Sequence, residues 1–204
     1  MFSPVSCLYA TQVRISEKAV YRPAPALLDD VRDKCGKGPD TFDECYIKAL
    51  KKAGANKAVI KFIKLVNEPG YVREFQEIGP VDVVFADFPF RANENQGIYI
   101  VNGDPRIINV DDLPAIKESM LEHNRSYTAL KKKYPNIALW IGDRSQVSIE
   151  HMKEGKLRIA VPYRLTNGCR ACEGLGTVHI GFDFDRAGKF EGRKLIDVSP
   201  HLPK

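Results

Sequence analysis

The spacing of apolar residues changes along this chain of 204 residues, and the change predicts its fold class. In the first half apolar side chains recur three and four residues apart, as on one face of a helix; Val59, Ile60 and Ile63 are an example. In the second half, short apolar and alternating segments are separated by glycine-containing turns, which is typical of antiparallel strands. We therefore predict one α+β domain over residues 1–204, with N-terminal helices and a mostly antiparallel C-terminal sheet.

Capping residues place two helices near the N-terminus. Pro25 suits the first turn of a helix, and Gly36 suits the left-handed residue that ends one. Thr41 and Glu44 have the spacing of a capping box, so a second helix is expected to begin there. Because the link between the two helices is short, we expect an antiparallel helical hairpin.

Further helices are predicted over residues 56–66, 70–79 and 113–133. The last is expected to be one long amphipathic helix, with a buried face made by Leu113, Ile116, Met120, Tyr127 and Leu130. Residues 1–22 are expected to form an arm or an edge strand. The other strands are expected over residues 81–88, 97–101, 106–110, 137–141, 146–151, 156–165, 176–184 and 189–198.

The composition restricts the class of protein. Apolar residues make up 44% of the chain and charged residues 28%, which is ordinary for a soluble globular protein. No apolar run is long enough to cross a bilayer, so no membrane span is expected. A net charge of +5 without a focused basic patch makes nucleic acid an improbable partner. A protein or a small polar ligand is the expected partner.

Two of the five cysteines are predicted to form a disulfide in the helical hairpin. Cys35 should end the first helix and Cys45 should lie in the first turn of the second, which brings them within bridging range. The alternative is two buried free thiols. A disulfide implies an oxidising compartment, and therefore export. The N-terminus has no basic region followed by an apolar core, so either a signal peptide has been removed or the protein is cytoplasmic.

Cys169 and Cys172 form a Cys-x-x-Cys sequence between two predicted strands. A redox-active pair usually opens a helix, whose N-terminus lowers the thiol pKa. Gly174 and Gly176 make a following helix improbable, and Glu173 would raise rather than lower a nearby thiol pKa. Zinc binding would need a second ligand pair, and the candidates for it, Cys7, His151 and His179, have no ligand spacing. We predict a structural pair, with a thiol-redox role as the alternative, and no metal or cofactor.

A group of polar residues follows the buried strand that ends near Phe88. It consists of Asp87, Arg91, Asn93 and Asn95. Binding groups are often placed at a strand end, where a rigid base meets open space, so these residues are candidates for holding a polar ligand. The alternative is a structural loop held by an Asp87–Arg91 ion pair.

A second polar group ends another predicted strand and contains Trp140, the only tryptophan in the chain, with Asp143 and Arg144. The two groups would form one site if the two strand ends share an edge. The alternative is an ordinary turn beside a core aromatic residue.

No nucleophile with a partnered base, phosphate loop or dinucleotide fingerprint is present in the sequence. The leading hypothesis is a non-enzymatic exported binding or assembly protein with disulfide-pinned elements. The second is a small enzyme with its site around Asp87, Arg91, Asp143 and Arg144. The third is a thiol-redox protein that uses Cys169 and Cys172.

Overall fold

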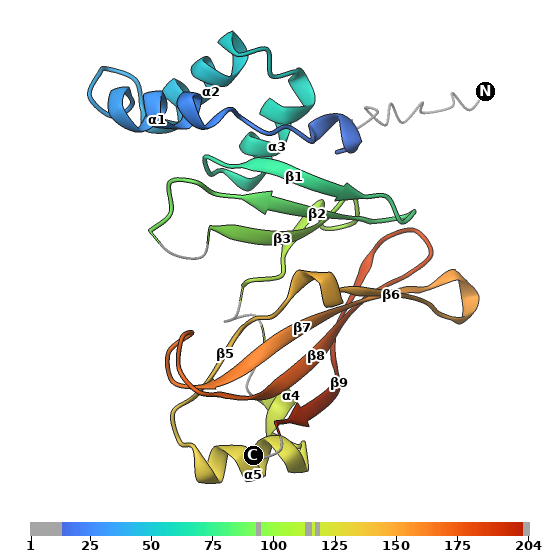
Figure 1. Cartoon of the computed structure of the whole chain (residues 1–204). Coiled ribbons are helices and arrows are strands. Elements are labelled where there is room, and N and C mark those ends of the chain that lie inside the picture. Colours follow the sequence, from blue (N-terminus) through green and yellow to red (C-terminus); the bar gives the residue numbers. More distant parts are fainter. Residues whose placement is uncertain (1–13, 93–94, 113–115, 117–118, 202–204) are drawn as a thin grey trace, which may run out of the picture.

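The computed structural model describes residues 14–92, 95–112, 116 and 119–201. Three layers are stacked in this part of the chain (Figure 1). Helices cover one face of a four-stranded antiparallel sheet, and the other face of that sheet packs on a second antiparallel sheet of five strands. The chain is thus a mixed α+β protein with a C-terminal sheet.

The helical layer contains the 3-10 helix η1 (Glu17–Ala19) and the α-helices α1 (Pro25–Lys34), α2 (Phe42–Lys52) and α3 (Lys57–Val66). The predicted capping box is present: Glu44 N–H donates to Thr41 Oγ1 (3.3 Å), and Thr41 N–H donates to Glu44 Oε2 (3.0 Å). Asn56 caps α3 by accepting from the N–H groups of Ala58 and Val59. These helices begin where local hydrogen bonds satisfy their free N–H groups.

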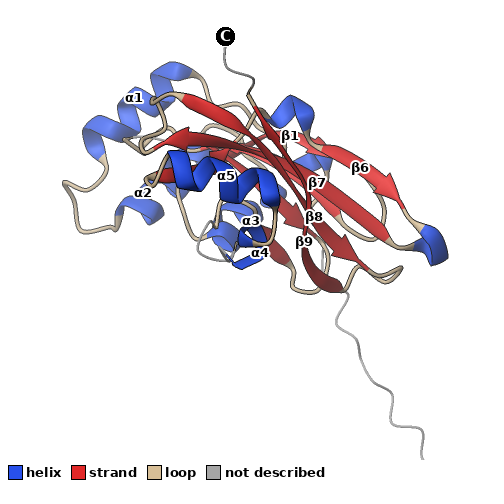
Figure 2. Cartoon of the chain, turned by 90° about the horizontal axis from the view of Figure 1, so that it is seen from below, coloured by secondary structure: helices blue, strands red, loops and turns tan. Residues whose placement is uncertain are grey.

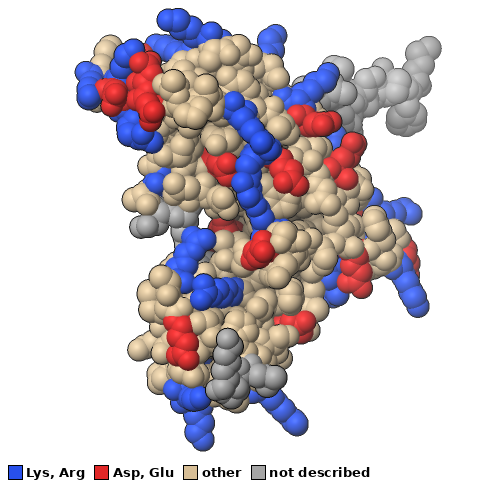
Figure 3. Space-filling model, in the orientation of Figure 1, with Lys and Arg blue, Asp and Glu red and all other residues tan. Residues whose placement is uncertain are grey.

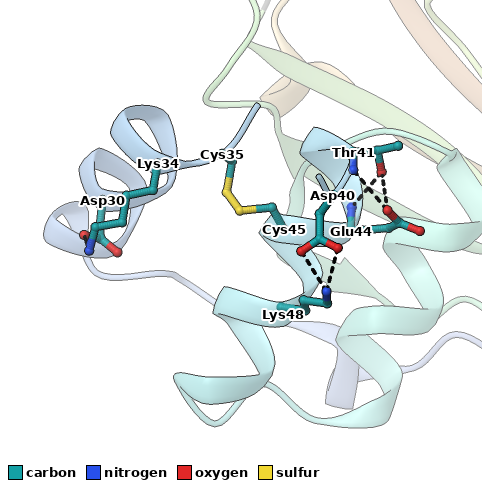
Figure 4. Close-up of a disulfide and its surroundings, with 8 residues drawn as sticks. All are labelled: Asp30, Lys34, Cys35, Asp40, Thr41, Glu44, Cys45 and Lys48. Atoms are coloured by element: carbon teal, nitrogen blue, oxygen red, sulfur yellow. Dashed lines mark hydrogen bonds and ion pairs between the residues drawn. A yellow bond between two sulfur atoms is a disulfide. The ribbon is translucent and has the colours of Figure 1, made fainter. Parts of the chain in front are cut away.

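Cys35 and Cys45 lie at disulfide distance, with 5.6 Å between their Cα atoms. Cys35 follows the last residue of α1 and Cys45 lies in the first turn of α2, as predicted (Figure 4). Nearby, Lys48 Nζ lies 2.7 Å from Asp40 Oδ2, so an ion pair also closes this loop. Val31, Tyr46 and other residues of the small core beneath the loop are buried.

The arm that precedes α1 is anchored to the first sheet. Ile15 N–H donates to Asn102 Oδ1 (2.7 Å), and Val20 forms a parallel bridge with Val72. The arm or edge strand is predicted over residues 1–22, of which residues 1–13 lie outside the described residues.

The first sheet has the strand order β1 (Tyr71–Gln76), β2 (Asp82–Asp87), β3 (Gln96–Val101) and β4 (Ile107–Asn109). Successive side chains along each strand point to opposite faces of this sheet. Val84 and Ala86 of β2 face the helices and contact the cluster that contains Phe62. Val83 and Phe85 face the second sheet.

The prediction of a helix over residues 70–79 is wrong, because this segment contains β1. Val72 is fully buried, and Arg73 lies at a bulge in the pairing with β2. The apolar spacing fits a helix, but β2 is buried on both faces and β1 supplies hydrogen bonds along one of its edges. This non-local pairing outweighs the local pattern.

The second sheet contains β5 (Ile137–Ile141), β6 (Ser148–His151), β7 (Leu157–Asn167), β8 (Gly174–Phe184) and β9 (Phe190–Pro200). Its strand order is β5-β7-β8-β9, and β6 also pairs with β7. The connections include the 3-10 helices η3 (Arg144–Gln146) and η4 (Lys153–Gly155). The main core lies between the sheets and includes Ile98, Ile100, Ile159, Val161, Ile180 and Phe182.

Backbone hydrogen bonds join the two sheets at one end, which we call the joined end. Asp104 N–H donates to the carbonyl of Gly188 (2.9 Å), and Phe190 N–H donates to the carbonyl of Asp104 (2.8 Å). A Cβ atom on Gly103 would lie 2.6 Å from the Gly188 carbonyl oxygen, so this approach requires glycine at position 103.

The single long helix over residues 113–133 is not confirmed. The described part contains two helices, α4 (Ser119–Glu122) and α5 (Arg125–Lys133), which lie against β9 (Figures 1 and 2). Asn124 has an extended backbone and its side chain accepts from Tyr127 N–H, so it caps α5 and interrupts the helical pattern. Ile116 and Tyr127 are buried as predicted, and Leu113 lies outside the described residues. Within the described ranges, no helix is long and apolar enough to cross a membrane.

Candidate functional site

The two sheets diverge at the end opposite the joined end, and we call this region the open end (Figure 1). Here Asp87 ends β2, Gln96 begins β3, and Gly142, Asp143 and Arg144 follow β5. Figure 3 shows a notch at the left between the upper and lower parts of the molecule, with basic side chains on its lower side. The open end therefore offers polar groups from both sheets to solvent.

One depression of about 240 Å³ lies between the sheets at the open end, and we call it the inter-sheet depression. It is lined by Gln96, Gly97, Ile98, Asp111, Ile141, Gly142, Asp143, Arg144 and Arg170. A second depression of about 340 Å³ lies on the outer side of β5, and we call it the outer depression. It is lined by Trp140, Ile141, Gly142, Asp143, Gln146, Pro162, Arg164, Arg170, Thr177 and His201. The two adjoin, because four residues line both.

Gly142 lines both depressions and must be glycine for the chain after β5 to approach β7. Its N–H donates to the carbonyl of Pro162 (2.9 Å), which extends the pairing of the two strands. A Cβ atom at position 142 would lie 2.8 Å from the Pro162 carbonyl oxygen. Residues 143 and 144 therefore leave the sheet from a fixed point.

Asp143 and Arg144 place opposite charges beside this point. Asp143 caps η3: its Oδ1 accepts from Ser145 N–H (2.9 Å), and this hydrogen bond lowers the pKa of the exposed Asp143 carboxyl. Asp143 is therefore ionised at neutral pH. Arg144 is half-buried and forms no ion pair with a described carboxylate. Its guanidinium is available to an acidic group of a ligand.

The Cys-x-x-Cys sequence forms a tight turn between β7 and β8. The Cα atoms of Cys169 and Cys172 are 5.1 Å apart, at disulfide distance. Arg164 of β7 donates to the carbonyls of Arg170 (3.5 Å) and Cys172 (3.3 Å), which ties the turn to the sheet. Within the described residues no helix follows Cys172, so the thiols lack the helix N-terminus that the redox hypothesis needs. The turn instead positions Arg170 beside both depressions.

The other predicted site residues do not line these depressions. Asp87 pairs across the strands with Gln96 and so lies beside the open end, but its carboxylate faces Arg73 (Oδ2 to Nε, 3.8 Å). Burial, followed by the charge of Asp87 and a hydrogen bond to it, raises the pKa of the Tyr71 hydroxyl. Asn95 accepts from Phe88 N–H through its backbone carbonyl (2.7 Å), and Asn93 lies outside the described residues.

The expected Asp87–Arg91 ion pair is wrong, because Arg91 binds Glu68 instead. Its Nε and Nη2 atoms lie 2.6 Å and 2.5 Å from the two oxygens of the Glu68 carboxylate, a bidentate arrangement. The guanidinium also lies over the Phe88 ring, 3.9 Å from its centroid. Glu68 is 23 residues away in sequence, and no local pattern indicated the pairing.

Sequence reasoning missed Arg164, Arg170, Gln96 and His201. Arg164 lies opposite Trp140 in the β5–β7 pairing, so the strand register would have shown it. Arg170 was considered only as a neighbour of the two thiols. The group that the structure brings together is therefore the predicted Trp140, Asp143 and Arg144 with these additional residues.

Comparison with known proteins found no matching family model, no matching curated protein and no matching solved structure. Among the described residues, no group of three or more His, Cys, Asp or Glu side chains is placed to hold a metal ion.

Proposed function

We propose that this chain is a binding protein that holds a small polar ligand with an acidic group at the open end. The observation that carries the proposal is the convergence of three arginines from separate segments. Arg144 follows β5, Arg164 belongs to β7, and Arg170 lies in the β7–β8 turn. Planar guanidinium groups bind carboxylate, sulfate and phosphate through paired hydrogen bonds.

The contacts that restrict the backbone around these arginines favour a preformed site. The Cys169–Cys172 pair and the Arg164 hydrogen bonds restrict the turn that carries Arg170. Gly142 fixes the backbone that carries Arg144. Fixing binding groups before the ligand arrives lowers the entropy lost on binding.

Binding is favoured over catalysis by the hydrogen bonding at the site. Thr177 and His201 both line the outer depression, yet no hydrogen bond joins them. His201 Nδ1 instead lies 3.2 Å from the carbonyl oxygen of Gly174. An activated hydroxyl nucleophile would need such a partnered base.

We also propose that the protein is exported. Two cysteine pairs lie at disulfide distance, and disulfides persist mainly in oxidising compartments. We infer that the protein is periplasmic or secreted.

The test is a titration with sodium sulfate at constant ionic strength. Binding is monitored by ¹H–¹⁵N NMR signals of the backbone and of the arginine side chains. Saturable shifts are expected at residues 141–146 and around Arg164 and Arg170. Arg144→Gln should weaken the apparent affinity about tenfold, since one charge-assisted contact is worth about 1.4 kcal/mol or more. Arg186→Gln, an exposed change in the β8–β9 turn near the joined end, serves as the matched control. Equal affinities in the two variants, or shifts spread over the whole surface, would contradict the proposal.

A further inference from the structure

Trp140 presents a fixed aromatic surface in the outer depression. Its Nε1–H donates to Thr166 Oγ1 (3.0 Å) and also approaches the Gly168 carbonyl (3.4 Å). These bonds hold one edge of the indole against the sheet and restrict its rotation. The side chain is only partly buried and lines the outer depression. A ring that is held at its edge can receive a flat apolar group on its face.

The groups around the indole both donate and accept hydrogen bonds. Gln146 contributes an amide, Thr177 a hydroxyl and His201 an imidazole, while the Asp143 carboxylate only accepts. A ligand with several hydroxyl groups matches this mixture, because each hydroxyl also both donates and accepts. The nearby C–H groups on one face of a pyranose ring form an apolar patch that suits an aromatic face.

Arg164 and Arg170 border the same depression and add a preference for acidic groups. Arg164 lies directly opposite Trp140 in the strand pairing, so its guanidinium and the indole belong to one surface. At about 340 Å³, the depression is at the lower end of the range for ligand pockets, about 300–1,000 Å³. It suits one or two sugar rings rather than a folded partner.

From this arrangement we propose that the ligand is an acidic saccharide built from hexuronate units. One pyranose ring lies on the face of Trp140, its hydroxyls bind Asp143 and Gln146, and its carboxylate binds Arg164 and Arg170. This inference rests on the proposed function, since it names the ligand of the same site. A nucleotide could also stack on the indole, but its base offers few hydroxyl groups to Asp143, Gln146 and Thr177, whereas a saccharide offers several.

The experiment uses the intrinsic fluorescence of the protein, because Trp140 is the only tryptophan in the chain. Emission therefore reports on the outer depression alone. The full chain is titrated with trigalacturonate, with a glucuronate-containing chondroitin tetrasaccharide, with maltotriose as the neutral match, and with adenosine monophosphate. All titrations are made at equal ionic strength. At least one uronate oligosaccharide is expected to change the emission saturably and to bind at least tenfold more tightly than maltotriose.

Three variants, measured by calorimetry, identify the groups responsible. Trp140→Ala should weaken uronate binding at least tenfold, and Trp140→Phe, which keeps an aromatic ring, should retain most of it. Arg170→Gln should reduce the preference for uronate over maltotriose, because Arg170 borders the outer depression. Circular dichroism shows whether each variant is folded. The ligand titrations of the wild-type protein test the inference independently of the variants.

Each other outcome decides the question. If sulfate binds at the open end but neither uronate is preferred over maltotriose, the saccharide inference fails while the proposed function stands. If adenosine monophosphate binds more tightly than the uronates, the ligand is a nucleotide and the inference fails. If neither sulfate nor any of these ligands binds, both proposals fail.

Discussion

The Cys35–Cys45 disulfide should stabilise the protein more than the Cys169–Cys172 disulfide does, although the latter lies at the candidate site. The first pair is separated by 10 residues in sequence and the second by 3. In the chain-entropy description, a cross-link stabilises the fold by restricting the unfolded chain, and the effect grows with the logarithm of loop length. Losing the first bridge should cost about 3 kcal/mol of unfolding free energy, and losing the second about 2 kcal/mol.

Equilibrium urea unfolding of two double variants measures the difference. Both cysteines of a pair are replaced by alanine, because Cys35 is only 7% exposed and a serine hydroxyl there would be buried. The variants are compared where the slope of the unfolding free energy against urea concentration is equal, because the transition midpoint then reports the free energy of unfolding. A loss below about 1 kcal/mol for Cys35→Ala with Cys45→Ala, or a larger loss for the other pair, would refute the reasoning.

Two further predictions concern the second sheet and the joined end. Asp183→Asn should cost on the order of 2 kcal/mol at pH 7, because Arg158 donates to both carboxylate oxygens (2.6 Å and 2.9 Å). Hydrogen bonding to Arg158 lowers the Asp183 pKa in the folded state, so this stabilisation is present above the unfolded-state pKa of about 3.9 and is lost as the pH falls through the folded-state value. Urea unfolding should therefore show that Asp183→Asn lowers the free energy of unfolding less at pH 3 than at pH 7. An equal loss at both pH values would exclude the ionic explanation. Gly103→Ala should cost about 1–3 kcal/mol, since its Cβ would lie 2.6 Å from a backbone oxygen of Gly188. Hydrogen exchange at Phe190 N–H should then become faster, and unchanged exchange would show that the joined end tolerates the methyl group.

The elements predicted correctly are those whose signals are local. The Thr41 capping box, the Asn56 cap and the turn at Asp185–Gly188 each act within a few residues, so the helices α2 and α3 and the last hairpin follow from the sequence. The segment that contains β1 was misassigned because its conformation depends on pairing with β2. The segment before Tyr134 was misassigned because an asparagine that fits a helix interior poorly instead caps a new helix at position 124.

The candidate site was only half predictable, for a related reason. Trp140, Asp143 and Arg144 could be singled out because they end a strand. Arg164 could not, because a charged residue in an alternating strand is ordinary until its partner is known. A shift of one residue in register would move it to the other face of the sheet. The position of Arg170 likewise depends on where the β7–β8 turn folds back.

The joined end and the open end differ in whether backbone hydrogen bonds connect the two sheets. This difference explains why the candidate binding groups lie at the open end. At the joined end, backbone hydrogen bonds from Asp104 N–H and Phe190 N–H connect the two sheets directly. At the open end the strands stop before the sheets meet, and side chains from β5, β7 and the β7–β8 turn project beyond them. The three arginines there all belong to the second sheet and its connections, so their separation is set by the pairing of β5, β7 and β8. A ligand there meets a frame that is already in place, which is the condition under which separate arginines act together.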